Sequence, residues 1–402
     1  MSNTQFSTWN TSQRSDYWCL TGAIAMVGLA LGSLLPLTSI LLAHTGSSGS
    51  TIGMVIAIHA LGLVCAILLG ERSCRRYGAR RTIEFFGVGA AVIACFMQGL
   101  TEPFIVAVLL FILGLFLGVV LNTVETWVNV AVPEGQRGRW LAIHCTIFTL
   151  FQLCGPILIQ QLPAGHEYQL CGILMLMTWP IYRRLSPQKL DDEEGASGDS
   201  VSWYAYLFTA PVVVVSTALF ALFDTLVLGL LPLYALAQGM DTSTALLSAS
   251  VVLAGDTALE IIIGVLADRF GRVRVHTACA IILLCSAVLL PTYIGTLFWW
   301  PALFVMGGSA GGIYVLSMMA CGQRFKGNQL LRMTALLGSV WGIASIIGPL
   351  TTGAIMVKNM RWSVPVVVFS MAVFLLFALF LEQKKSQNSQ EKLQKLKECS
   401  NA

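Results

Sequence analysis

The stretch "DTALEIIIGVLADRFGR" (residues 256–272) joins an apolar run to a charged end. Residues 257–267 hold a single charged side chain, Glu260, whereas Asp268, Arg269 and Arg272 follow within five positions. This pattern is typical of a helix that crosses an apolar phase and leaves it where the charges begin. A carboxylate inside a membrane is costly, so Asp256 and Glu260, four residues apart, are candidates for a functional role.

The composition indicates a membrane protein. The chain has 402 residues, of which 56% are hydrophobic and 11% charged, whereas a soluble protein carries about 25% charged residues. Lipid is therefore the expected solvent. The eleven cysteines show no CxxC or CxxxH spacing, so neither a disulfide framework nor a metal site is expected. No P-loop, HExxH, GxSxG or dinucleotide motif is found, and we expect no enzyme, no cofactor and no nucleic-acid partner.

Apolar stretches of about 20 residues recur along the chain, each long enough to cross a bilayer as a helix. The predicted spans are 17–43, 49–69, 82–100, 104–131, 140–161, 168–184, 204–236, 243–267, 275–295, 298–320, 331–357 and 362–381. These twelve spans predict an all-α polytopic membrane protein in which both termini lie on the same side.

The basic residues orient these spans. Of the 24 lysines and arginines, all but Lys358 and Arg361 fall at the ends of spans or in segments on the side of the termini, and none lies deep in a span. Because such residues favour the cytoplasmic face, we expect both termini in the cytoplasm of a bacterial cell, with the protein in its inner membrane. The cytoplasmic ends would be residues 1–16 and 382–402.

The two halves of the chain repeat one another at a constant offset of 193 residues. The matching positions are Arg76 and Arg269, Gly78 and Gly271, Arg81 and Arg274, Gly114 and Gly307, Gly118 and Gly311, Arg139 and Arg332, and Gly155-Pro156 and Gly348-Pro349. Such an offset predicts two pseudo-symmetric six-helix bundles, residues 17–184 and 204–381. The polar segment 185–203 would be the cytoplasmic linker between them.

A loop motif carries a family resemblance. "GVLADRFGRVR" (264–274) resembles the G-x-L-x-D-R-x-G-R-x-R loop of the major facilitator superfamily, and the matching residues are Gly264, Asp268, Arg269, Gly271, Arg272 and Arg274. The first-half copy, "GERSCRRYGARR", is degenerate, because Arg75 stands where the aspartate belongs and Gly70 is one position out of register. The resemblance implies alternating access by two rocking bundles around a central cavity.

Two further segments, "TVETWVNVAVPEGQRGR" (123–139) and "GGIYVLSMMACGQRF" (311–325), are similar to a branch of poorly characterised bacterial carriers of that superfamily. Many drug/proton antiporters of the superfamily have an arginine in the fourth helix, and "VLLFILGLFLG" (108–118) has none. Of their glycine-rich motif in the fifth helix only Gly155-Pro156 is present. A multidrug proton antiporter of the usual sort is therefore disfavoured.

The motif residues predict a cytoplasmic gate. Asp268, at the end of the eighth span, can approach the N-terminus of the eleventh, where the helix dipole and free amides favour an anion. Arg269 and Arg272 can pair with carboxylates at the same surface. The alternative is that these charges serve only to set the topology.

Three carboxylates are predicted near mid-membrane. Glu260 lies about 12 Å and Asp256 about 18 Å from Asp268 along a helix, and Asp224 lies in the middle of the seventh span. With no buried lysine or arginine nearby they cannot all be ionised at low cost, so protons or a cationic ligand must share the site. The alternative is packing of protonated acids between helices.

The first half offers its own candidates. Asn122, Glu125 and Asn129 share one helix face, and Glu125 is expected either to pair with Arg139 at the gate or to contact the solute. His59 and Gln152 lie near the middle of their spans, where either contacts solute, relays a proton or simply packs.

These features predict a monomeric secondary transporter of a small solute, proton-coupled, with the direction of transport open. One alternative is a transition-metal or cation uptake carrier. Its candidate soft ligands would be Met318, Met319 and Cys321, or His144 and Cys145. The alternative outside transport is a membrane receptor or regulator.

Overall fold

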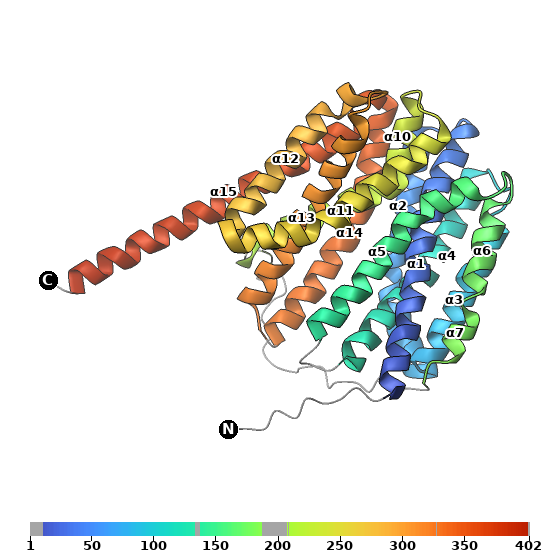
Figure 1. Ribbon diagram of the computed structural model, residues 1–402, viewed down its shortest axis with the longest axis horizontal. Helices are drawn as coiled ribbons and strands as arrows, with labels where there is room; N and C mark the ends of the chain where they lie inside the picture. The colour runs from blue at the N-terminus through green and yellow to red at the C-terminus, as the bar shows by residue number, and fades with distance from the viewer. Residues whose placement is uncertain (1–10, 133–136, 187–206, 208, 327, 401–402) are drawn as a thin grey trace.

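The computed structural model describes residues 11–132, 137–186, 207, 209–326 and 328–400, and within them the secondary structure is helical, without a strand (Figure 1). The first half contributes α1 (Thr11–His44), α2 (Gly49–Tyr77), α3 (Ala79–Phe96), α4 (Pro103–Ala131), α5 (Arg137–Gln161), α6 (Glu167–Leu176) and α7 (Trp179–Arg183). The second half contributes α9 (Pro211–Gly229), α10 (Leu231–Ala237), α11 (Thr242–Phe270), α12 (Arg272–Tyr293), α13 (Trp299–Arg324), α14 (Asn328–Lys358) and α15 (Met360–Ser400).

The helices lie where the twelve spans were predicted. Ten helices of the described chain are long and apolar enough to cross a membrane. The predicted span 82–100 corresponds to α3, whose 18 residues include Arg80, Arg81 and Glu84. The span 168–184 is divided between α6 and α7, and 204–236 corresponds to α9 and α10. The second of these breaks comes just before Pro232, which has no backbone N–H to continue a helix.

At both ends of the chain the helices extend beyond the predicted spans. Helix α1 already begins at Thr11, so the described part of segment 1–16 is helical. Helix α15 continues to Ser400 and projects from the bundle (Figure 1), because residues 382–400 contain neither glycine nor proline to stop it. Of the predicted linker 185–203 only the first two residues are described, and the backbone N–H of Ser186 donates to Asp16 Oδ1 at 2.9 Å.

The repeat is structural as well as sequential. Helices α2 and α11 are each 29 residues long. Their N-caps Ser48 and Asp241 lie 193 positions apart, and each side chain accepts a hydrogen bond from the backbone N–H three residues on. Gly78 and Gly271, which end the two helices, have φ of 83° and 90°, a conformation that favours glycine. The second half therefore repeats the backbone of the first.

Glycine lets the repeated helices touch. A Cβ added at Gly114 of α4 would overlap the backbone oxygen of His59 on α2, and one at the equivalent Gly307 of α13 would overlap that of Val252 on α11. Helices that meet without side chains between them pack backbone to backbone, which compensates for the weak hydrophobic drive inside a membrane.

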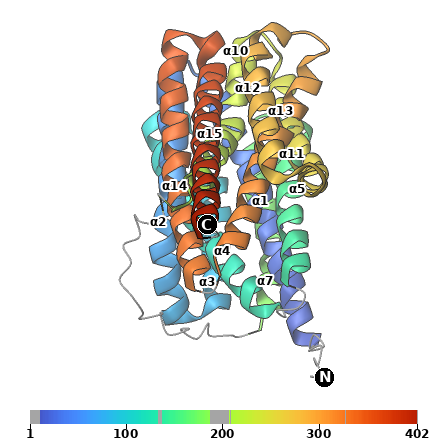
Figure 2. The ribbon, with the colours of Figure 1, turned by 90° about the vertical axis from the view of Figure 1, so that its left-hand side faces the viewer.

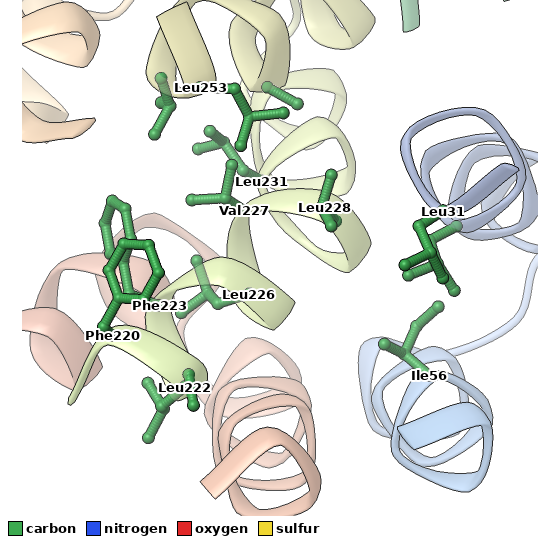
Figure 3. Packing of buried hydrophobic residues seen from close by; sticks show 14 of the residues in the cluster. Leu31, Ile56, Phe220, Leu222, Phe223, Leu226, Val227, Leu228, Leu231 and Leu253 are labelled. Atoms are coloured by element: carbon green, nitrogen blue, oxygen red, sulfur yellow. The ribbon is translucent and has the colours of Figure 1, made fainter. Parts of the chain in front are cut away.

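The two bundles meet along two pairs of helices. In Figure 2, α14 and α2 lie along one side of the molecule and α5 and α11 along the other, and both pairs are in contact. Figure 3 shows side chains of α9, such as Leu228, between Leu253 of α11 and the pair Leu31 and Ile56 of α1 and α2. The buried core is thus continuous across both bundles.

We call the end at which α1 ends and α2 begins the apex, at the top of Figure 2, and the opposite end the base. Two hydrogen bonds between described residues join the bundles, both toward the apex: Ser243 Oγ donates to Gln160 Oε1 at 2.5 Å, and Ser250 Oγ to the Leu153 carbonyl at 2.9 Å. A Cβ at Gly53 of α2 would overlap the backbone oxygen of Pro349 on α14. The apex is therefore tightly closed.

The glycine contact predicts a specific sensitivity. Gly307→Ala places a methyl group on the backbone of Val252, and overpacking of this kind costs about 1–3 kcal/mol. We expect a lower melting temperature in thermal unfolding of the detergent-purified chain. Gly338→Ala is the matched control, because nothing lies within 4 Å of its added Cβ, and its melting temperature should be unchanged or higher. Equal melting temperatures for the two variants would contradict this account of the α11–α13 contact.

Candidate functional site

Asp256 lies at the contact between α11 and α13. Its side chain is 7% exposed, and Oδ1 has no hydrogen-bond partner. A Cβ added at Gly311 of α13 would overlap that oxygen. The carboxylate therefore occupies the space that a side chain at position 311 would fill.

The structure brings the three predicted carboxylates together. Asp256 is within electrostatic reach of Glu260 on its own helix and of Asp224 on α9. Glu260 lies about 15 Å and Asp256 about 21 Å from the end of α11 at Phe270. Both Asp224 and Glu260 are partly exposed, and no ion pair or hydrogen bond to another described residue engages any of the three carboxylates. They form an acidic group without a counter-charge.

A fourth carboxylate faces this group from the other bundle. Glu125 of α4 is exposed, and its charge reaches Cys145 of α5 and Tyr314 of α13. Tyr314 is also within reach of Asp256 and Glu260. We use the term acidic site for Asp224, Asp256, Glu260 and Glu125, which come from α9, α11 and α4. The site spans the interface between the bundles.

The predicted pairing of Glu125 with Arg139 is not present in this structure. Both side chains are exposed, and no ion pair joins them. The backbone oxygen of Glu125 accepts a hydrogen bond from Asn129 Nδ2 at 2.9 Å, which leaves its carboxylate uninvolved. Glu125 therefore belongs with the acidic site by position.

Three aromatic rings lie beside the carboxylates. Phe220 of α9 stacks on Tyr314 of α13 with ring centroids 4.8 Å apart, and Trp341 of α14 lies edge-on to both at 5.5 and 5.4 Å. We call these rings the aromatic cluster. Phe220 precedes Asp224 by one helical turn, so α9 presents a ring and a carboxylate on one face.

The three rings of the aromatic cluster were not among the predicted site residues. Comparison of the two halves at the 193-residue offset would have pointed to the cluster, because the first-half equivalents of Phe220 and Tyr314 are aliphatic. The first-half equivalents of the three carboxylates are aliphatic as well. The equivalents of the three carboxylates are Leu31, Leu63 and Ile67, and those of the three rings are Val27, Leu121 and Phe148. The repeated fold therefore accommodates apolar residues at all six positions.

The remaining first-half candidates are placed separately. His59 is buried, its Nε2 has no hydrogen-bond partner, and its ring edge lies against Gly114. Gln152 is buried on α5 where a Cβ at Gly32 would overlap its backbone oxygen. Asn122 is partly exposed and lies one turn before Glu125. No hydrogen bond joins these three side chains to the acidic site within the described chain.

The loop motif lies at the base. Gly264 has open space around its Cβ position, and Arg274 is exposed. Arg272 donates from Nη2 to Gln323 Oε1 at the end of α13, and the Arg269 guanidinium lies 5.4 Å from the Phe270 ring centroid. Asp268 is exposed and makes no hydrogen bond to α14 among the described residues.

A metal site is not assembled among the described residues, where no three His, Cys, Asp or Glu side chains come together. Cys321 is buried beside Phe325 and Met333. His144 shares a hydrogen bond of 3.1 Å with Thr21 Oγ1. Cys321 and His144 are thus engaged in packing and helix contacts, whereas Cys145 is exposed.

Comparison with known proteins settles the family. The sequence model described as the Major Facilitator Superfamily matches residues 20–255 and 213–400. The chain belongs to the Major Facilitator Superfamily. An uncharacterized MFS-type transporter of Bacillus subtilis, YfkF, is 24% identical over 85% of this chain and 88% of its own length. Another from Enterobacter sp. strain 638 is 24% identical over 90% of this chain and 94% of its own.

Solved structures share the fold. The nucleoside transporter NupG superimposes with a TM-score of 0.71 at 14% identity, covering 92% of this chain and 99% of its own. A D-xylose-proton symporter gives 0.68 at 15% identity, covering 90% and 96%. The predicted fold class of this superfamily member is confirmed. The chain is a multi-pass membrane transporter of small solutes and not an enzyme.

The negative charge of the acidic site should affect how fast the Cys145 thiol is modified when the chain is in lipid nanodiscs. Cys145 is exposed near Glu125 and Glu260, and a focused negative potential raises the local concentration of cations roughly tenfold or more. We expect a trimethylammonium-ethyl methanethiosulfonate to modify Cys145 roughly tenfold faster than the sulfonatoethyl analogue. Peptide mass spectrometry measures both rates.

Two controls accompany this measurement. The double variant Glu125→Gln, Glu260→Gln should lose most of the preference for the cationic reagent. Cys285 of α12 is also exposed, but its neighbours Ile282 and Leu289 are exposed apolar residues. We expect this surface to face lipid, so Cys285 should react with neither reagent. Equal rates for the two reagents at Cys145 would contradict a negatively charged, water-filled site.

Proposed function

We propose that the chain is a proton-coupled secondary transporter in which Asp224, Asp256 and Glu260 bind the coupled proton or the solute. The observation that carries this proposal is the unpartnered, buried Oδ1 of Asp256 beside two further carboxylates. In the first bundle, Glu125, His59, Asn122 and Gln152 are proposed to contact the solute or the proton from the opposite side.

The physical argument rests on desolvation. An ionised carboxylate buried without a partner costs several kcal/mol, and the membrane portions of α9, α11 and α13 contain no lysine or arginine. The stable states of the site are therefore those that hold a proton or a cation. A carboxylate that must bind a proton or cation on one side of the membrane and release it on the other couples proton flux to solute flux when the bundles rock.

The geometry supports a specific stage of that cycle. The bundles are joined at the apex by Ser243 and Gln160, while Glu125 of the acidic site and the nearby Cys145 are exposed. By the distribution of its basic residues the base faces the cytoplasm, which makes this an inward-facing conformation. The rocking units would be residues 17–184 and 204–381, in a monomer of the bacterial inner membrane with both termini in the cytoplasm.

The loop motif is proposed to act as a latch at the base. In this conformation Asp268 makes no hydrogen bond to the described residues of α14, whereas closure of the base would bring it to the amides at the start of that helix. Arg269, Arg272 and Arg274 would pair with carboxylates of the same surface, and the positive φ of Gly271 allows the tight connection between α11 and α12.

The alternatives find less support. A transition-metal carrier would need a set of metal ligands, and the described residues hold no group of three. A receptor or regulator would not require carboxylates without counter-charges in the middle of a bundle. Transport coupled to protons accounts for that feature directly.

The proposal is tested in two steps. A metabolite and drug library is first screened for thermal stabilisation of the purified chain, since a ligand at 100 times its Kd stabilises by about 2.7 kcal/mol. Hits are then added to proteoliposomes that contain a trapped pH indicator. We expect a solute-dependent proton flux that is lost in Asp256→Asn and Asp224→Asn, because the amide cannot release a proton.

Asp241→Asn is the matched control, because it makes the same chemical change on α11 at an exposed N-cap, where asparagine also caps well. Its proton flux should equal that of the native chain. Full proton flux in Asp256→Asn and Asp224→Asn would return both carboxylates to a structural role. Solute uptake that moves no protons in any variant would remove the coupling.

A further inference from the structure

We propose that the acidic site and the aromatic cluster together bind an organic cation that carries aromatic or other apolar groups. The inference names the substrate class of the transporter proposed above, and it rests on that function for its biological meaning. The binding itself can be tested separately.

The rings and the charges converge on Tyr314. Its ring stacks on Phe220 and contacts Trp341, and its hydroxyl-bearing side chain is within electrostatic reach of Asp256, Glu260 and Glu125. Tyr314 and Trp341 are partly exposed, whereas Phe220 lies buried behind them. A solute in the site would therefore meet the two exposed rings and the carboxylates at once.

This pairing of groups selects a kind of solute. A cation within about 6 Å of an aromatic centroid is attracted by the negative face of the ring, and a carboxylate of Asp256, Glu260 or Glu125 would supply the countercharge when ionised. An anion would be repelled by the ionised carboxylates, and a neutral solute would leave their charge to be neutralised by protons alone. An inorganic cation could be held by carboxylate oxygens alone, so it would leave the aromatic cluster without a role.

The repeat indicates that packing does not require these residues. Positions equivalent to Asp256, Phe220 and Tyr314 are Leu63, Val27 and Leu121, on helices that run in the same arrangement. The first half folds with aliphatic residues at positions where the second half has three carboxylates and two additional rings. Their concentration in one bundle points to a ligand.

The experiment measures equilibrium binding of radiolabelled tetraphenylphosphonium to the purified full chain. Tetraphenylborate, which has the same shape and opposite charge, and tetraethylammonium, which has the charge without rings, are tested separately by thermal shift. We expect micromolar binding of tetraphenylphosphonium, weakened at least tenfold in Trp341→Leu and in Asp256→Asn. Tetraethylammonium should stabilise the chain less, and tetraphenylborate not at all.

Matched variants separate recognition from folding. Trp362→Leu makes the same change at an exposed tryptophan at the start of α15 and should bind as the native chain does. Trp341→Phe, which retains a ring, should recover at least half of the lost affinity. Equal stabilisation by tetraphenylborate, or binding indifferent to both Trp341→Leu and Asp256→Asn, would overturn the inference.

The outcome is distinguishable from failure of the proposed function. Cation binding that depends on Trp341 and Asp256 but evokes no proton flux would support this inference and refute the coupling. A neutral or anionic solute that drives proton flux through Asp256, in a chain that does not bind tetraphenylphosphonium, would do the reverse.

Discussion

The close contact between α11 and α13 is the interaction on which the rest of the site depends. Gly307 lets the two backbones meet, and Gly311, one turn further along, leaves the space that the Asp256 carboxylate occupies. With a larger residue at either position, the helices would separate or the carboxylate would have to move. Glycine at these two positions therefore allows both the close packing of two membrane helices and the placement of a buried carboxylate between them.

The same helix contact exists in the first bundle, where it holds no carboxylate. Gly114 and Gly118 bring α4 against α2, and the residue equivalent to Asp256 is Leu63. The two bundles therefore share one helix arrangement but differ in the side chains at this contact, a carboxylate in the second and a leucine in the first. Three of the four carboxylates of the acidic site and all three rings of the aromatic cluster belong to the second bundle, and the shared core around α9 joins it to the first (Figure 3).

Much of the fold was predictable because its determinants are local. Apolar length predicts the spans, and the 193-residue offset predicts equivalent caps such as Ser48 and Asp241. The grouping of Asp224 with Asp256 was also within reach, because both lie at mid-membrane depth. The aromatic cluster was not, since contact among Phe220, Tyr314 and Trp341 depends on how three separate helices are rotated about their axes. Likewise, the expected pairing of Glu125 with Arg139 depends on a conformational state that no single-sequence pattern specifies.

The unbroken course of α15 gives the molecule a mechanical property. The last membrane helix and the tail that follows it form one continuous rod, which extends about 27 Å beyond residue 382. A rotation of the second bundle by about 10° would carry the tip through about 5 Å, given that length. The tail is therefore a rigid extension of the bundle that holds Asp224, Asp256 and Glu260. Whatever is attached near Ser400 moves with the transport cycle.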